Sequence, residues 1–291
     1  MRNSIPLPDV DAVVIGGGPA GLQAGLTLAR MHRRTVLFDS GRYRNETVAH
    51  SHNLLTNDGR SPAELRRIGR EELSAYDDVE VRDDEVMTIE KDGDGRFVVT
   101  TSGGSLRARS VVLATGMRDV LPAIPGLAEA WGREVAQCPF CHGHEYAGRV
   151  VALLADGEHA RLLEAMLRPI VADVVALSPG TVRKARRADG GMVLTLTDGG
   201  QRTVDGVFVA ATSHQSAPFA AQLGCRLTPS GGIEIDAMGR TSVPGVYAGG
   251  DLAHVAAAPG PLVSLAAAIA AGQLAAATCV RELAARDLGD A

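Results

Sequence analysis

A glycine-rich turn between an apolar run and a helical segment constrains this sequence more than any other feature. The apolar run covers residues 10–15 and is followed by Gly16-x-Gly18-x-x-Gly21. In a strand–turn–helix unit the first glycine permits the tight turn, the second lets a pyrophosphate approach the backbone, and the third lets helix and strand pack closely. Asp39 ends the next apolar run, where a carboxylate can bind a ribose hydroxyl. The sequence therefore predicts a βαβ dinucleotide-binding unit, with an empty glycine turn as the alternative.

A second strand–turn–helix pattern forms a weak internal repeat further along the chain. Its strand covers residues 149–154, its turn covers 155–160, and its helix ends near Leu167. Between the two patterns, short apolar runs over 79–114 with glycine-rich turns predict an antiparallel meander. Residues 117–127 contain two prolines and are expected to form a linker. We expect an α/β fold with two Rossmann-like dinucleotide-binding domains.

Length and composition limit the class of protein. The 291 residues suffice for about two domains, and 45% of them are hydrophobic, as in ordinary globular proteins. A net charge of −5 provides no basic surface for nucleic acid, and 3% aromatic residues provide few platforms for base stacking. The first ten residues lack the apolar core of a signal peptide, and the uncharged, alanine-rich stretch 252–280 favours a buried helix over a membrane span. We expect a cytoplasmic protein without nucleic-acid or membrane partners.

Two later segments resemble the FAD signatures of the two-dinucleotide-domain flavoproteins. Residues 112–116 read VLATG, and residues 241–251 read TSVPGVYAGGD. In that family the aspartate of the second segment contacts the ribityl chain of the flavin, which implies this role for Asp251. The residues that the glycine motif and this resemblance assign to FAD binding are Gly16, Gly18, Pro19, Ala20, Gly21, Asp39, Ser40, Ala114, Thr115, Gly116, Gly250 and Asp251.

A CxxC motif lies between these segments, where residues 138–141 read CPFC. In a chain with dinucleotide-binding units such a pair indicates redox chemistry. Half of a structural zinc site is the alternative, since His142 and His144 could supply further ligands. Cys225 and Cys279 form no second CxxC and are expected to be inert buried thiols. The redox interpretation is favoured because a flavin can exchange electrons with a dithiol, and no metal is expected.

Two histidines and Glu145 follow the second cysteine directly. An adjacent imidazole can lower the pKa of a thiol or move its proton. We expect Cys138 and Cys141 to be the catalytic pair, His142 to act as general acid or base, and His144 to be a second candidate for that role. A solvated loop histidine is the alternative for each of them.

FAD signatures at both ends with CxxC between them resemble the low-molecular-weight thioredoxin reductases over essentially the whole chain. The resemblance implies a discontinuous FAD domain over residues 1–118 and 231–291, with an inserted domain over 119–230 that carries the NADPH site and CxxC. It also implies that Cys141 faces the flavin, that Cys138 exchanges with the substrate, and that the protein is a homodimer.

The second nucleotide loop departs from that family, which has GxGxxA there. Residues 155–160 read ADGEHA, so one glycine is missing, and Asp156 and Glu158 place negative charge where a pyrophosphate would lie. The family's basic stretch for a 2′-phosphate is replaced by residues 178–180, which read SPG. The basic run over 183–187 is expected to be a solvated loop, with replacement of the family's basic stretch as the alternative. We therefore expect a degenerate NADPH site.

Several motifs resemble a narrower branch, the FAD-dependent dithiol oxidases of disulfide natural products of the gliotoxin and holomycin type. These motifs are CxxCHGxE over 138–145, Arg44-Asn45, and DGxxPxEL over 58–65. The resemblance adds Arg44 and Asn45 to the expected cofactor-binding residues. It implies that a small-molecule dithiol attacks the disulfide at Cys138 and leaves as a disulfide, with O₂ as electron acceptor and H₂O₂ as product.

Two other functions remain open at this point. A thioredoxin reductase-like enzyme would run in the opposite direction and reduce a protein disulfide with electrons from NADPH or ferredoxin. A flavin-bearing redox sensor or dithiol-binding protein would show no turnover. The 155–160 loop favours the oxidase over the reductase, and the CxxC with its histidines favours an enzyme over a sensor.

Overall fold

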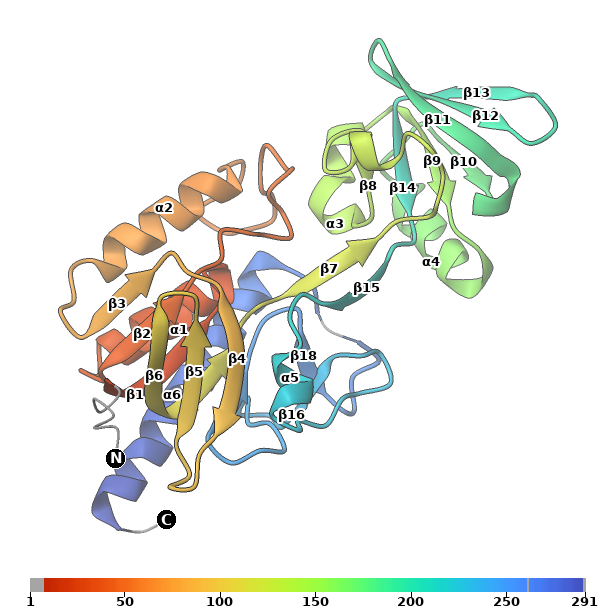
Figure 1. Cartoon of the computed structure of the whole chain (residues 1–291). Coiled ribbons are helices and arrows are strands. Elements are labelled where there is room, and N and C mark those ends of the chain that lie inside the picture. The colour runs from red at the N-terminus through yellow and green to blue at the C-terminus, as the bar shows by residue number, and fades with distance from the viewer. Residues whose placement is uncertain (1–7, 261, 290–291) are drawn as a thin grey trace. The chain divides into compact units, whose positions relative to one another are not determined.

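The computed structural model describes residues 8–260 and 262–289 (Figure 1). Pro261 and most of the N-terminal segment considered above for a signal peptide lie outside this described part. The chain divides into two compact units, each of the α/β class that the sequence predicts, and the first is discontinuous. The first unit comprises the residues up to Arg44, Ala63–Arg118 and the residues from His214 on, and the second comprises Asn45–Pro62 and Asp119–Ser213.

The first unit is built on a largely parallel sheet in the order β3-β2-β1-β6-β5-β4, with β17 paired to β6. The strands are β1 Asp9–Ile15, β2 Thr35–Phe38, β3 Val79–Arg82, β4 Val86–Lys91, β5 Phe97–Thr101, β6 Gly104–Leu113 and β17 Val246–Ala248. The predicted meander is correct for β4, β5 and β6, which pair antiparallel. It is wrong for β3, which pairs parallel with β2 because the chain crosses back through helix α2, Pro62–Leu73.

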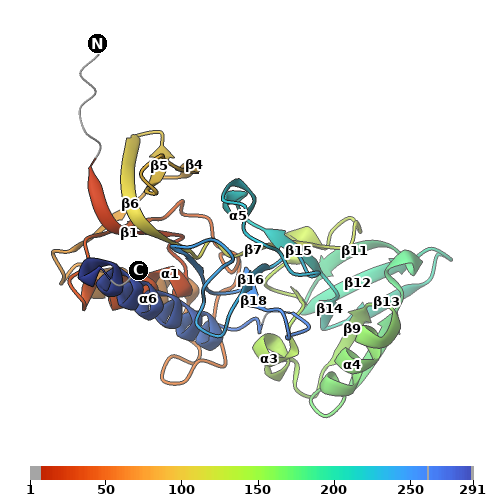
Figure 2. The same ribbon diagram turned by 90° about the horizontal axis from the view of Figure 1, so that it is seen from below.

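Helices α1, Pro19–Ala29, and α6, Leu265–Leu288, lie side by side in this unit (Figure 2). A Cβ atom on Gly272 of α6 would lie 2.0 Å from the carbonyl oxygen of Ala20 in α1, so the two backbones nearly touch. Alanines of both helices pack with β1 in one buried cluster. Residues 265–280 of the alanine-rich stretch lie in this helix, as predicted, because small side chains allow the close approach. The beginning of the stretch is not helical, since residues 253–255 form a strand. The unit is completed by α5 Phe219–Gln222, β16 Ile233–Ile235 and β18 Ala253–Val255.

The second unit contains a parallel sheet in the order β10-β9-β14-β8 and an antiparallel sheet in the order β11-β12-β13. Its strands are β8 Val135–Ala136, β9 Val150–Leu154, β10 Asp173–Leu177, β11 Val182–Ala188, β12 Gly191–Leu196, β13 Gln201–Val204 and β14 Gly206–Val209. Its helices are η1 Ala128–Ala130, α3 Pro139–His142, η2 His144–Tyr146, α4 Gly157–Leu167 and η3 Pro179–Thr181.

One prediction in this unit is wrong. The basic run over 183–187 is not a loop but part of β11, in which Val182 and Ala185 are buried and the basic groups face solvent. Asp205 lies at the break between β13 and β14. Its carboxylate accepts the backbone N–H of Val150 at 2.8 Å, which ties the break to β9.

The predicted linker over 117–127 begins with a strand. β7, Met117–Val120, pairs with β15, Thr212–Gln215, and in each of these strands the chain passes from one unit to the other. The prolines that suggested a linker lie beyond β7, so they do not interrupt its hydrogen bonding.

Candidate functional site

The turn between β1 and α1 presents backbone groups to a ligand. Gly16 has φ +115°, and a Cβ there would lie 2.2 Å from the carbonyl oxygen of Ala114, so only glycine fits. A Cβ on Gly21 would lie 1.7 Å from the carbonyl oxygen of Gly16. Gly18, the residue that precedes α1, differs, because a Cβ there would meet no atom within 4 Å. The turn thus leaves an open cradle at the helix N-terminus, where free N–H groups favour a phosphate.

Small residues from distant segments border this cradle. A Cβ on Gly250, at φ +92°, would lie 3.0 Å from the Cβ of Ala20. Ala20, Ala114 and Ala268 pack together as one buried cluster. Pro19 is the first residue of α1, a position where its missing N–H is not needed. Thr115 and Gly116 directly follow β6, beside β1 in the sheet. The structure therefore brings these predicted FAD segments together beside the open cradle at Gly18.

Asp39 directly follows β2, at the end of the predicted apolar run. Its carboxylate is already hydrogen-bonded to other groups of the protein. Its side chain is 2% exposed and accepts hydrogen bonds from the Tyr43 hydroxyl at 2.7 Å, the Arg70 guanidinium at 2.7 Å and the Gly41 N–H at 3.0 Å. Burial, and then the bond to Asp39, raise the pKa of Tyr43 to about 12. Ser40, the next predicted residue, is exposed. Sequence reasoning missed Arg70 because it belongs to α2, and no local motif links that helix to β2.

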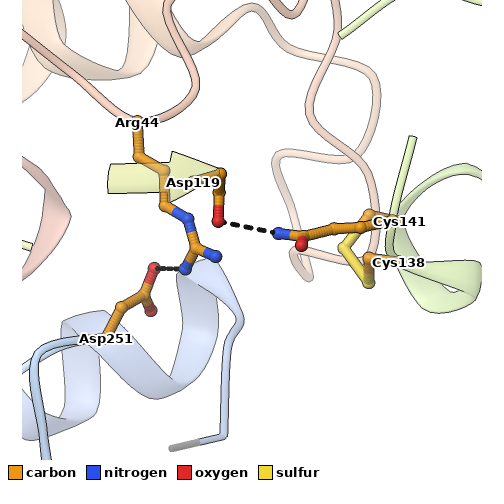
Figure 3. The surroundings of a disulfide bond; sticks show 6 residues. Arg44, Asp119, Cys138, Cys141 and Asp251 are labelled. Atoms are coloured by element: carbon orange, nitrogen blue, oxygen red, sulfur yellow. Dashed lines mark hydrogen bonds and ion pairs between the residues drawn. A yellow bond between two sulfur atoms is a disulfide. The ribbon is translucent and has the colours of Figure 1, made fainter. Parts of the chain in front are cut away.

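Arg44 and Asp251 were predicted from separate motifs, and the structure joins them. Arg44 Nη1 donates to Asp251 Oδ2 at 2.8 Å, with both side chains less than a fifth exposed (Figure 3). The guanidinium thus fixes the carboxylate of the glycine–aspartate motif. Asn45, the next residue after Arg44, is counted with the second unit.

In the second unit, Cys138 and Cys141 form a disulfide, with Cα atoms 5.3 Å apart (Figure 3). Helix α3 begins directly after Cys138, whose carbonyl oxygen accepts the N–H groups of Cys141 at 3.2 Å and His142 at 3.1 Å. Phe140, between the two cysteines, is 71% exposed. A single helical turn therefore carries the disulfide, an accessible aromatic ring and the predicted histidine.

The two predicted histidines have different surroundings. Both ring nitrogens of His142 are buried and have no hydrogen-bond partner in the described part of the chain. Burial lowers the pKa of His142, with Glu145 opposing this shift and His52 adding to it. A neutral imidazole of this kind can accept a proton. His144 lies in η2 and is exposed.

Some residues near the disulfide were not found from the sequence. Gln137, which precedes Cys138, donates to Asp119 at 3.4 Å (Figure 3). His52 lies 3.4 Å from Glu145, measured from Nε2 to Oε1, and 3.7 Å from Asp58, measured from Nδ1 to Oδ2. His52 stands in a polar segment without a motif of its own, so only the folded chain reveals this contact.

The other cysteines and the possible metal ligands do not form a second site. Cys225 and Cys279 are free and buried, as expected. Burial raises the pKa of both thiols, that of Cys279 to about 12, so neither is a good nucleophile. Among residues 8–260 and 262–289, no three side chains of histidine, cysteine, aspartate or glutamate are grouped so as to hold a metal ion. The geometry gives no support to the zinc alternative.

Known proteins place the chain in a family. Residues 10–154 and 155–275 match the model of the pyridine nucleotide-disulphide oxidoreductases. The chain belongs to this family. Thioredoxin reductase tcpT of Claviceps purpurea (strain 20.1) is 32% identical over 276 residues, which cover 83% of this chain and 86% of that relative. A probable thioredoxin reductase of Arthroderma benhamiae is 40% identical over 177 residues, but the match spans 59% of this chain and only 44% of the relative.

A solved structure has the same fold as this pyridine nucleotide-disulphide oxidoreductase. The crystal structure of HlmI matches it with a TM-score of 0.88 at 32% sequence identity, covering 99% of this chain and 96% of HlmI. The predicted resemblance to thioredoxin reductase-like flavoproteins and the predicted fold class are confirmed. Such members of the family bind FAD, so the chain is an FAD-binding oxidoreductase. No helix in the described residues is long and apolar enough to span a membrane.

Proposed function

We propose that this flavoprotein is a dithiol oxidase, which oxidises a small-molecule dithiol of the natural-product class to a disulfide and reduces O₂ to H₂O₂. The observation that carries the proposal is the single helical turn that holds both the Cys138–Cys141 disulfide and the neutral, unpartnered His142. A disulfide accepts two electrons from a dithiol by thiol exchange, and a base beside it increases the thiolate fraction of the attacking thiol.

The proposed roles of the residues follow the direction of thiol exchange. One substrate thiol gives its proton to His142 and attacks Cys138, which breaks the bond to Cys141. The second substrate thiol then displaces Cys138 and closes the product disulfide. Bound FAD supplies the acceptor for the two electrons of the reduced pair and the donor of electrons to O₂. The cradle at Gly18, with Asp251 held by Arg44, is proposed to bind that cofactor.

The second nucleotide loop supports an enzyme that does not need NADPH. Asp156 precedes α4 and accepts the Ser178 hydroxyl at 3.2 Å instead of capping its own helix. Glu158 lies in the first turn of α4. Two carboxylates at this helix N-terminus would repel a pyrophosphate that the helix dipole otherwise attracts. We propose that residues 1–118 and 231–291 form the FAD domain and that the insert 119–230 retains the CxxC but a degenerate NADPH site.

The exposed ring of Phe140 supports a small, partly apolar substrate. An aromatic face that is 71% exposed between the two cysteines offers apolar contact at the point of attack. Thiol exchange at Cys138 needs access for one dithiol only, so this contact suits a compact molecule.

The alternative function is a reductase that transfers electrons from NADPH or ferredoxin to a protein disulfide. The relatives named thioredoxin reductase favour it. A redox sensor without turnover is the remaining alternative. These functions differ in the source of electrons and in whether the protein turns over.

An anaerobic titration of the flavin absorbance distinguishes them. We expect dithiothreitol to bleach the flavin, and air to restore the colour and yield one H₂O₂ per dithiol over many turnovers. Stoichiometric NADPH should leave the flavin oxidised, since the loop before α4 repels it. Rapid bleaching by NADPH would establish the reductase instead, and a single turnover would establish the sensor.

The matched variants are Cys138→Ser and Cys225→Ser. The first should retain FAD and lose turnover by at least about 10³-fold, because no disulfide remains for exchange. The second removes a buried thiol in the other unit and should retain turnover. Full activity of the first variant would contradict the proposed scheme.

A homodimer in the cytoplasm completes the proposal. Thioredoxin reductase-like enzymes are typically homodimers. Light scattering should therefore give twice the mass of the 291-residue chain, while a monomer mass at micromolar concentration would contradict the homodimer. Cell fractionation tests the location.

A further inference from the structure

The segment Asn45–Pro62 belongs to the unit that carries the disulfide, although it lies far from CxxC in the sequence. Within that unit it places His52 3.4 Å from Glu145 and 3.7 Å from Asp58. The side chain of His52 is 25% exposed, against 37% for Glu145 and 68% for Asp58. Glu145, His52 and Asp58 thus form a row of three side chains. The row begins at Glu145 in η2, shortly after CxxC, and ends at the exposed Asp58.

The imidazole of His142, three residues before Glu145, lacks hydrogen-bond partners among the described residues. A buried polar atom without a partner destabilises the folded state, so folded proteins rarely keep one without a function. Here both nitrogens of one imidazole are in this state. The N–H of the same residue is bonded to the carbonyl oxygen of Cys138, so the ring is tied to the disulfide by one helical turn.

Two members of the row, Glu145 and His52, act electrostatically on the imidazole of His142. Burial gives the largest lowering of the His142 pKa; the charge of Glu145 opposes this lowering, and that of His52 adds to it. Glu145 thus stabilises the protonated ring, and a protonated His52 opposes it. The two groups have opposite effects on the same imidazole while they contact each other.

We propose that Glu145 and His52 are positioning residues for His142: Glu145 favours the protonated ring when His142 takes the proton of the substrate thiol, and His52, which contacts Glu145, opposes it. This proposal rests on the proposed dithiol oxidation. The substrate dithiol gives up two electrons and two protons as its product disulfide forms and the Cys138–Cys141 bond breaks. The cysteine pair keeps both electrons and one proton, as a thiol and a thiolate. The second proton is taken by His142 and is then released to solvent, so the exchange balances.

The test is the pH dependence of a single turnover, measured as flavin bleaching by dithiothreitol in a stopped-flow instrument without O₂. Neutral His142 is the active base, so the rate falls on the acid side as this ring is protonated. Glu145→Gln removes a group that raises the pKa of His142, so the acid limb should move to lower pH by roughly half a unit or more. Its maximal rate should fall about tenfold, since the protonated ring loses the carboxylate charge that stabilises it. His52→Asn removes a group that lowers the same pKa, so its acid limb should move to higher pH.

Controls separate this role from a structural one. His50→Asn changes an exposed histidine of the same segment, bonded to the Gly59 carbonyl oxygen, and should retain the wild-type profile. Glu145→Asp keeps the carboxylate and should restore most of the lost rate. NMR titration of ¹³C-labelled histidine in each variant reports the same shifts of His142 without turnover. The proposal would be overturned if the pH–rate profiles of Glu145→Gln and His52→Asn coincided with that of the wild type. Bleaching of the wild-type flavin by dithiothreitol would still support the oxidase in that case.

Discussion

Gly18 differs from Gly16 and Gly21 of the β1–α1 turn, because a Cβ on Gly18 would project into open space and not into protein backbone. Its backbone is extended, at φ −78° and ψ −177°, a conformation open to any residue. Gly18→Val should therefore leave the apoprotein as stable as wild type and weaken FAD binding by about 10- to 100-fold, since the methyl groups fill the cradle. The ratio of flavin to protein absorbance and the melting temperatures of the two apoproteins measure both effects.

Gly93→Val is the control for this change. Gly93 also faces open space, in the turn between β4 and β5, and its replacement should change neither FAD content nor stability. If Gly18→Val retained full FAD, the phosphate would have to lie elsewhere, and the cradle would be misassigned.

Some site residues could be predicted from the sequence and others could not. Gly16, Gly18 and Gly21 could be predicted because one short motif sets their backbone roles. Arg70 and His52 could not, because each acts on a group from a distant segment, Asp39 or Glu145, that only the fold brings near.

At the scale of elements, the contact between α1 and α6 fixes the start of α1, where we propose that the cofactor binds. A Cβ at Gly272 would lie 2.0 Å from the Ala20 carbonyl oxygen, and backbone cannot move aside as a side chain can. Gly272→Ala gains about 1 kcal/mol of helix propensity but forces the helices apart, so we expect a net loss of about 1–2 kcal/mol and a lower unfolding temperature. Thermal unfolding followed by circular dichroism measures the change.

Gly69→Ala in α2 is the matched helical control. Its nearest heavy atom would be the Leu22 Cδ1 at 3.1 Å, the end of a flexible side chain that can give way. This variant should be as stable as wild type or slightly more stable. Equal unfolding temperatures for Gly272→Ala and Gly69→Ala would show that the α1–α6 contact is looser than the structure indicates.

Helices and strands with a clear local sequence pattern were predicted well. Strands that depend on pairing with another strand were not. The buried strands β1 and β2 and helix α1 follow directly from apolar runs and glycine spacing. β11 was missed because its exposed face is basic and only its pairing with β12 completes the pattern. β7 was missed because its partner, β15, lies far along the chain.

At the scale of the whole molecule, the order of segments matters more than the list of elements. The chain enters the second unit after Arg44, leaves it after Pro62, enters again after Arg118 and leaves again after Ser213. The sequence indicated one insertion, because the CxxC domain has its own motifs, whereas residues 45–62 carry none that assigns them to it.

This order of segments decides how the unit with the disulfide can be exchanged between relatives. A contiguous fragment over 119–213 would lack His52 and the stretch around Thr47, which lies against Gly132 closely enough that a Cβ there would be 2.3 Å from the Thr47 hydroxyl oxygen. A chimera that transplants only the long fragment would join a CxxC from one parent to a histidine segment from the other. Recombination during evolution faces the same restriction, so the short segment and the long one are expected to be inherited together.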